Sequence, residues 1–222
     1  MLLKKTSFVL FLLPLFIALD AHAQFAVELS GSYDVQHGTY KLPTGLPFGQ
    51  GNGFGYMAAV SMDLVHFLGI TIGVKPAYEV QQFTSEQIDS LTLQTVANGG
   101  KEDVKMNLLS LDPYIRYSIP GTGGLFVQAA PSIKYVVSST FHLTPGTAGM
   151  PANEVTVNPD TVVTLKNALY NAKGTIGYAF SLLGIGFEPS VSAAFPITDL
   201  SDISDAKNWS VTTLYLSLAV RL

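Results

Sequence analysis

The histidines are the first side chains to consider for catalysis, and His142 has a hydroxyl at a useful spacing. In His142-Leu143-Thr144 the threonine follows two residues later, which on a strand places both side chains on one face. An enzyme that cleaves an acyl chain from a lipid could use such a pair as base and nucleophile. Threonine is a poorer match than serine, however, and no carboxylate that would orient His142 is evident nearby. His37 and His66 are isolated and expected to be solvated, the first at a rim and the second in a short turn.

Acidic residues and glycines offer two further possibilities, a cation site and a nucleotide-binding loop. Asp199, Asp202 and Asp205 are spaced three residues apart, whereas a calcium loop takes its ligands from alternate positions. Residues 49–55 alternate glycine with other residues, but they lack the Lys-Ser/Thr and the following helix of a phosphate-binding loop. A flexible loop is the better interpretation. The chain has no cysteine for a thiolate site. We therefore expect no metal, no cofactor and no catalytic residue.

The first 23 residues have the organisation of an export signal. Two lysines supply a positive start, an apolar run follows, and Ala21-His22-Ala23 offers a small-x-small cleavage site. The apolar run is about a dozen residues long, whereas a membrane-spanning helix needs roughly 20. The sequence therefore predicts a signal peptide over residues 1–23 and one mature domain over residues 24–222.

The composition of the mature chain excludes several classes of protein. It keeps 10 basic and 15 acidic residues, so no basic surface is available for a nucleic acid. The full chain is 48% apolar, yet nothing after the signal peptide approaches the 18 consecutive apolar residues that would indicate a membrane-spanning helix. The apolar residues must therefore be interleaved with polar ones.

Alternation with a period of two is the main pattern after the signal peptide. In residues 70–81, isoleucine, valine, proline and tyrosine take the even positions, while smaller or polar residues take the odd ones. Eight segments show this pattern with differing regularity, at residues 25–36, 56–64, 70–81, 109–117, 125–137, 171–180, 185–195 and 213–222. Their lengths suit tilted strands that cross a bilayer.

Charged residues avoid the apolar face of all eight segments. Eleven of them, Asp34 included, lie on the polar face, and the other 14 in the mature chain lie in the connections. The interior of an eight-stranded barrel is just wide enough for side chains, so charges enclosed there should pair. We predict a structural interior polar cluster of ten residues: Glu28, Asp63, Lys75, Glu79, Asp112, Arg116, Lys134, Lys173, Glu188 and Arg221.

The connections alternate between short and long. Short links are predicted at residues 65–69, 118–124 and 181–184, and long polar ones at residues 37–55, 82–105, 138–168 and 197–208. Such alternation indicates antiparallel strands with one plain rim and one elaborate rim, as in outer-membrane barrels. The predicted fold is all-β, an eight-stranded antiparallel up-and-down transmembrane β-barrel.

A soluble barrel that encloses a small ligand, of the lipocalin type, would show the same alternation. Its outer face would carry many lysines and glutamates on every strand, whereas the polar face here is mostly small residues with one or two charges per strand. The polar face therefore suits a narrow interior. A barrel that binds or transports a small ligand, secreted or in the membrane, stays as an alternative, and a lipid-modifying enzyme as a further one.

Four prolines fit the pattern poorly, because proline removes a hydrogen-bond donor and a closed barrel has no edge strand. All four lie inside segments, on the apolar face: Pro76, Pro113, Pro131 and Pro189. We expect bulges or weakened pairing where they occur.

Three stretches resemble the outer-membrane β-barrel domain family of the Bacteroidetes type, related to the transmembrane barrel of OmpA-like proteins. They are residues 109–137 (LSLDPYIRYSIPGTGGLFVQAAPSIKYVV), residues 174–202 (GTIGYAFSLLGIGFEPSVSAAFPITDLSD) and the final WSVTTLYLSLAVRL. The resemblance implies an eight-stranded barrel with periplasmic termini, inserted by the outer-membrane assembly machinery, which reads the last strand. That strand usually ends in an aromatic residue, whereas here it ends in Leu222. The resemblance also leads us to expect no attached peptidoglycan-binding domain.

The expected protein is a non-enzymatic, monomeric barrel of the bacterial outer membrane. Side chains would fill its interior, and four long extracellular loops would serve envelope structure or recognition. Its expected partners are outer-membrane lipid, the assembly machinery during insertion and an unknown extracellular partner of the loops.

Overall fold

The computed structural model of the chain describes residues 24–41, 47–89, 94–96, 99–144, 155–157, 165–201 and 207–221. The predicted signal peptide over residues 1–23 lies outside this range, and so does Leu222. Within the described residues, no helix is long and apolar enough to cross a membrane.

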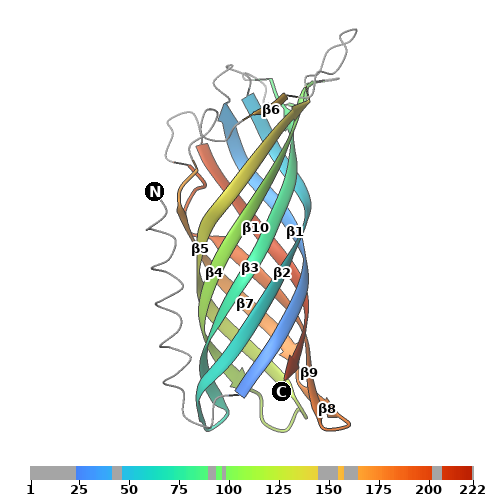
Figure 1. Cartoon of the computed structure of the whole chain (residues 1–222), viewed down its shortest axis with the longest axis vertical. Helices are drawn as coiled ribbons and strands as arrows, with labels where there is room; N and C mark the ends of the chain where they lie inside the picture. Colours follow the sequence, from blue (N-terminus) through green and yellow to red (C-terminus); the bar gives the residue numbers. More distant parts are fainter. Residues whose placement is uncertain are drawn as a thin grey trace.

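Ten strands within the described residues form one sheet that closes on itself (Figure 1). They are β1 (Gln24–Lys41), β2 (Pro47–Phe67), β3 (Ile70–Gln87), β4 (Lys101–Ser118), β5 (Leu125–Thr144), β6 (Val155–Val157), β7 (Ala168–Tyr178), β8 (Phe180–Leu182), β9 (Ile185–Pro196) and β10 (Lys207–Arg221). The eight long strands pair in the order β1-β2-β3-β4-β5-β7-β9-β10, and β10 pairs back with β1. Short strands β6 and β8 add to β5 and β9. All pairings are antiparallel, so the predicted eight-stranded up-and-down barrel is confirmed.

Short turns join the strands at the lower end of Figure 1, which we call the turn end. Residues 68–69 and 183–184 form two-residue turns, and residues 119–124 form a longer one. The first two are leucine followed by glycine, with φ of 49° at Leu68, 80° at Gly69, 53° at Leu183 and 83° at Gly184. Positive φ at both positions defines the type I′ turn, whose twist matches that of a hairpin. We call the opposite end the loop end.

The strands extend much further toward the loop end than the sequence analysis predicted. β1 runs to Lys41, β2 begins at Pro47, β4 begins at Lys101 and β5 runs to Thr144. The prediction that residues 37–55, 82–105, 138–168 and 197–208 are long loops is therefore wrong for much of their length. Only residues 42–46 separate β1 from β2.

The prediction failed because the alternation continues past these points with its polarity reversed. On β4, Lys101, Asp103 and Lys105 are exposed, while Val104 and Met106 are buried. In the other half of the same strand, apolar side chains such as Ile115 are exposed and the polar ones are buried. Segments chosen by an apolar outer face end where this reversal occurs.

The loop-end half of the barrel encloses an apolar core. Trp209, the only tryptophan in the chain, is fully buried there, and its ring stacks on Tyr40 with a centroid distance of 4.3 Å. The apolar core comprises Tyr40, Phe48, Phe83, Val104, Met106, Leu108, Phe141, Leu169, Leu200, Trp209 and Val211. This half of the barrel is thus built like a soluble protein, with polar side chains outside and a packed apolar interior.

Residues 49–55, interpreted above as a flexible loop, instead belong to β2. A Cβ atom on Gly51, Gly53 or Gly55 would overlap a backbone carbonyl oxygen of β3. The glycines are therefore needed for the close approach of two strands.

The four prolines interrupt the strand pairing without shifting its register. Pro113 and Pro131 lie at opposed positions of β4 and β5, and pairing is missing between residues 112–114 and 130–132 while the register on both sides is the same. Pairing of β2 with β3 has a gap at Pro76, and pairing of β7 with β9 stops next to Pro189. Of the two expectations for the prolines, weakened pairing is therefore the one observed.

We predict that Phe141→Ala lowers the free energy of unfolding by about 3–5 kcal/mol, because it leaves a cavity in the apolar core. Urea unfolding of the refolded barrel, followed by the emission of Trp209, measures the change. The control is Thr140→Ala on the exposed side of the same strand, expected to change stability by less than about 0.5 kcal/mol. Equal effects of the two substitutions would contradict a packed core at the loop end.

Candidate functional site

The interior of the turn-end half is the main polar site of the barrel. All ten members of the predicted polar cluster have ion-pair partners there, and every partner belongs to the cluster. The pairs are Lys75–Glu28 (2.7 Å), Lys134–Glu79 (2.9 Å), Arg116–Glu188 (2.8 Å), Lys173–Asp112 (3.3 Å), Arg221–Glu188 (3.0 Å) and Arg221–Asp63. We call these ten residues the ionic core. Each pair joins different strands, so the pairs link the barrel wall across its interior.

Glu79 is one of the most deeply buried residues of the ionic core. Its carboxylate accepts hydrogen bonds from Lys134 Nζ at 2.9 Å, from Gln81 Nε2 at 2.9 Å and from the Tyr215 hydroxyl. The ring of Tyr215 lies 4.4 Å from the Lys173 ammonium, within the range of a cation–π contact. The buried side chain of Tyr215 therefore contacts Glu79 through its hydroxyl and Lys173 through its ring.

A second level of pairs lies between Glu79 and the turn end. Lys75 donates to Glu28, whose other oxygen accepts from Ser30. Asp112 accepts from Lys173 at 3.3 Å and from the Ser132 hydroxyl at 2.5 Å. The Asp112–Ser132 bond joins β4 to β5 where the prolines interrupt the backbone pairing. A side-chain bond therefore connects the two strands at the gap.

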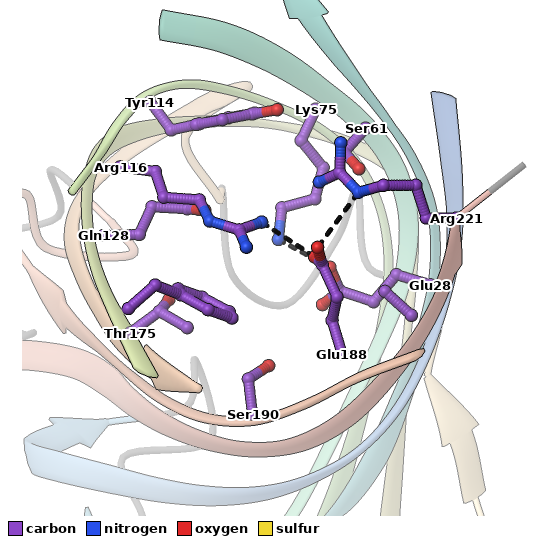
Figure 2. Close-up of a pocket in the computed structure, with 12 residues that line it drawn as sticks. Glu28, Ser61, Lys75, Tyr114, Arg116, Gln128, Thr175, Glu188, Ser190 and Arg221 are labelled. Carbon is purple, nitrogen blue, oxygen red and sulfur yellow. Dashed lines mark hydrogen bonds and ion pairs between the residues drawn. The ribbon is translucent and has the colours of Figure 1, made fainter. Parts of the chain in front are cut away.

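Nearest the turn end, five charged side chains line a small cavity, namely Glu28, Lys75, Arg116, Glu188 and Arg221 (Figure 2). Arg116 and Arg221 both donate to Glu188, and Arg221 also donates to Asp63, which accepts from the Tyr114 hydroxyl. The Arg116 guanidinium also lies 3.7 Å from the centre of the Phe126 ring. The cavity has a volume of about 20 Å³, enough for roughly one water molecule. This space is too small for an organic ligand.

Two buried carboxyl groups lack the cationic partners that the ionic core provides. Asp34 is fully buried, and its Oδ2 accepts from the backbone N–H of Gln82 at 3.1 Å. Glu102 is buried within the apolar half and accepts a hydrogen bond from the Tyr40 hydroxyl. The sequence analysis assigned Glu102 to a connection, because it did not follow β4 through the reversal of polarity.

The environment of Glu102 makes it a weak acid. Burial raises the pKa of Glu102 to about 7, with a smaller increase from the charge of Asp103 and an opposing effect of the hydrogen bond from Tyr40. Burial and the neighbouring carboxylate also raise the pKa of Tyr40 well above its usual value. At neutral pH, a large fraction of Glu102 is therefore protonated.

The three histidines of the mature chain lie apart from one another. His37 Nε2 contacts Thr212 Oγ1 at 3.0 Å, and His66 Nδ1 contacts Thr71 Oγ1 at 2.9 Å. His66 lies in β2 and not, as predicted, in a turn.

His142 has a neighbour that the sequence analysis missed. Asp103 lies directly opposite His142 in the register of β4 and β5. The Asp103 carboxylate also accepts a hydrogen bond from the Thr84 hydroxyl. The acid thus lies between the hydroxyl of Thr84 and the imidazole, whereas acyl-transfer triads place the imidazole in the middle. This arrangement does not activate Thr84 as a nucleophile.

Within the described residues, no group of three or more histidine, aspartate or glutamate side chains could hold a metal ion. Asp199 is described, while Asp202 and Asp205 lie outside the described residues. The arrangement that the structure does define, paired charges with a cavity the size of one water, suits a filled interior.

No protein-family model and no curated protein matches the chain. Solved structures with a similar fold include Neisserial surface protein A, at 9% identity and a TM-score of 0.46, covering 90% of this chain and 97% of that one. Another is Ail, the attachment invasion locus protein of Yersinia pestis, solved in complex with the heparin analogue sucrose octasulfate. Its identity is 10% and its TM-score 0.43, and the match covers 90% of this chain and 99% of that one. A third is the outer membrane protease OmpT of Escherichia coli. Its identity is 9% and its TM-score 0.36, and the match covers 90% of this chain and 93% of that one. All three are outer-membrane β-barrels. Similarity this low assigns no function to the chain.

We predict that Glu79→Gln destabilises the barrel by about 3–5 kcal/mol, because it leaves the Lys134 ammonium buried without its counter-ion. Adding Lys134→Met to this variant should restore part of the stability. Urea unfolding of the refolded protein measures both changes. The control is Glu86→Gln, which breaks the exposed pair of Lys101 and Glu86 and should cost less than about 1 kcal/mol. A Glu79→Gln variant no less stable than the Glu86→Gln variant would contradict an enclosed ionic core.

We predict a pH dependence of stability that originates at Glu102. Because its pKa is raised from 4.5 to about 7, the folded chain holds this proton at pH values where the unfolded chain has lost it. The resulting stability is complete below pH 4.5 and declines as the pH rises to about 7, by up to about 3 kcal/mol. Glu102→Gln should remove this decline. The measurement is the difference in unfolding free energy between the unsubstituted chain and the Glu102→Gln variant from pH 4.5 to about 7. A difference that does not change with pH would contradict a raised pKa of Glu102.

Proposed function

We propose that this protein is an outer-membrane β-barrel with a filled, non-conducting interior. In this proposal its loop-end half stands outside the cell and carries connections that serve envelope structure or recognition. The observation that carries the proposal is the reversal of polarity, which occurs on the outer and inner faces at the same level of the barrel.

The outer face of the turn-end half is apolar and exposed. Leu29, Ile115 and Leu216 are 65%, 58% and 70% exposed, on three different strands. Among the described residues, no charged side chain lies on this face, since the charged residues of this half are those of the ionic core and Asp34. A continuous apolar surface of this kind around a protein indicates contact with lipid.

Aromatic side chains border this apolar belt on both sides. Toward the loop end lie Tyr33, Phe54, Tyr56, Tyr78, Tyr135, Tyr170 and Phe195, which cross-strand pairing places at neighbouring levels. Toward the turn end lie Phe67, Tyr117, Tyr178 and Phe180. Rings of aromatic residues at the two membrane–water interfaces are typical of outer-membrane barrels. They support a membrane position that leaves the loop-end half in water.

The two faces argue against a soluble barrel that binds a small ligand. Such a barrel needs an apolar interior behind a polar wall, whereas the belt region has a charged interior behind an apolar wall. The loop-end half does have an apolar interior, but aromatic and aliphatic side chains fill it. The cavity at the turn end holds about one water. These features support a barrel that neither conducts ions nor carries a ligand inside.

The turns and the termini support an orientation for the proposed membrane barrel. Gln24 at the start of β1 and Arg221 at the end of β10 lie at the turn end, where Arg221 donates to Gln24. Outer-membrane barrels have short periplasmic turns, so we place the turn end and both ends of the barrel in the periplasm. In the proposal the protein is monomeric and its partners are lipid, the assembly machinery and a binding partner of the loop end.

We predict that the mature protein needs detergent or lipid to stay in solution and that its gel mobility changes on boiling. In planar bilayers it should give no conductance steps. Leu216→Arg, on the lipid side of the belt, should lower folded stability in lipid vesicles by about 2–4 kcal/mol. Lys105→Ala, on the exposed face of the loop-end half, serves as the control and should have little effect.

Two outcomes would overturn different parts of the proposal. A chain that is monodisperse without detergent would contradict the membrane position. Reproducible conductance steps in the folded protein would contradict the filled interior.

A further inference from the structure

Two leucines form the tips of the barrel at the turn end. They belong to similar four-residue stretches, Phe67-Leu68-Gly69-Ile70 and Leu182-Leu183-Gly184-Ile185. The side chains of Leu68 and Leu183 are 80% and 94% exposed, although the turns of a barrel that end in water are ordinarily polar.

The backbone conformation makes leucine an unfavourable residue at both tips. Leu68 and Leu183 occupy the first central position of a type I′ turn, with φ of 49° and 53°. Asparagine, aspartate and glycine adopt this left-handed conformation readily, whereas a leucine Cβ is strained there. Local backbone geometry therefore does not account for leucine, and the side chain itself must have a use.

The surroundings of the two tips are apolar as well. Next to Leu68 in the turn, Phe67 is 67% exposed, and next to Leu183, Leu182 is 58% exposed. Ile70 and Ile185, which follow the glycines, are exposed on the outer wall. His66 and Ser181 are exposed near the tips, but the exposed side chains of Phe67, Ile70, Leu182 and Ile185 connect the tips with the apolar belt.

The length of the belt places the tips at the second membrane surface. From Leu68 to Tyr78, in the aromatic ring toward the loop end, the chain covers 11 residues. A tilted strand needs about 9–11 residues to cross the hydrocarbon core. From Leu183 to Phe195, which belongs to the same aromatic ring, the chain covers 13 residues. With the aromatic ring at one surface of the hydrocarbon core, Leu68 therefore reaches the other surface, and Leu183 lies about two residues beyond it, at the headgroups.

We propose that the two leucine turns insert into the inner leaflet of the outer membrane and hold the turn end at the boundary between headgroups and acyl chains. This inference rests on the membrane position proposed above.

The third turn provides the contrast. Residues 119–124 contain proline, threonine and three glycines, and the Thr122 hydroxyl donates to the Ile119 carbonyl at 2.7 Å. Pro120 at its tip is exposed, and we assign this turn to water.

The test uses single cysteines, because the chain has none of its own and each new one is a unique labelling site. Nitroxide labels are attached to Leu68→Cys, Leu183→Cys, Pro120→Cys, Leu216→Cys and Lys105→Cys variants of the mature protein. The variants are refolded into vesicles of phosphatidylcholine and phosphatidylglycerol. Power saturation with oxygen, which concentrates in acyl chains, and with a water-soluble nickel chelate gives the depth of each label.

The expected result is that labels at positions 68 and 183 are more accessible to oxygen than to nickel. The label at position 216 should lie deeper still, while those at positions 120 and 105 should be accessible to nickel. A deep label at position 216 with nickel-accessible labels at positions 68 and 183 would overturn the insertion of the leucine turns and leave the membrane position intact. A nickel-accessible label at position 216 would overturn the membrane position itself. Equal depth at positions 68, 183 and 120 would show that the leucines have no special role.

A second experiment separates the side chain from the turn. Leu68→Asn suits the left-handed backbone better than leucine but is polar, whereas Leu68→Met stays apolar. With the label at Ile70→Cys, Leu68→Asn should increase nickel accessibility and Leu68→Met should not. In detergent, the thermal stability of the Leu68→Asn variant should be no lower than that of the unsubstituted chain. Identical label depths in the two variants would overturn the anchoring role of the leucine.

Discussion

A β-strand sends successive side chains to opposite faces, so the medium outside a closed barrel restricts what can fill it. In the turn-end half the outward side chains are apolar. The inward side chains, at the alternate positions, are polar and lie in an enclosed space. In the loop-end half the outside is polar, and the same alternation brings aliphatic and aromatic residues inside. β4 shows both regimes on one inward face, with Val104 and Met106 at one end and Asp112 and Arg116 at the other. The ionic core and the apolar core are therefore two consequences of one pattern.

Enclosure sets strict conditions on the ionic core. Charges away from water cost several kcal/mol each unless partners and hydrogen bonds compensate, and Glu79 meets this condition with three donors. Apolar side chains of similar volume would often be as stabilising as a buried ion pair, whereas removing one partner of a pair is costly. Glu102 shows the other solution. It lies among apolar side chains with the Tyr40 hydroxyl as its hydrogen-bond donor, and a raised pKa allows it to stay neutral.

The sequence was sufficient to predict the number of long strands, their antiparallel order and the short turns, and it put Asp34 and the ten residues of the ionic core on the face that lies inside the barrel. It was not sufficient where the alternation changed phase. On β5 the register against β4 shifts next to Val137, so that Val136 and then Phe141 face inward although their positions differ in parity. Such a bulge leaves no mark in hydrophobicity. Tyr114 and Tyr215 were not predicted as site residues for another reason, because a search for charged residues on the inward face does not identify the hydroxyls that bind Asp63 and Glu79.

The prolines raise the question of how a closed sheet can lose backbone hydrogen bonds. Each proline removes an N–H donor and leaves a carbonyl oxygen without its partner, and in the proposed membrane position no water is available to replace the donor. Placing Pro113 opposite Pro131 puts two missing donors at one point of the β4–β5 ladder, so pairing is interrupted once and resumes in the same register. An unpaired carbonyl is tolerated better than an unpaired N–H. At this gap, Ser132 and Asp112 join the strands from the inside. The ionic core therefore also supports the wall at the point where the backbone alone does not close it.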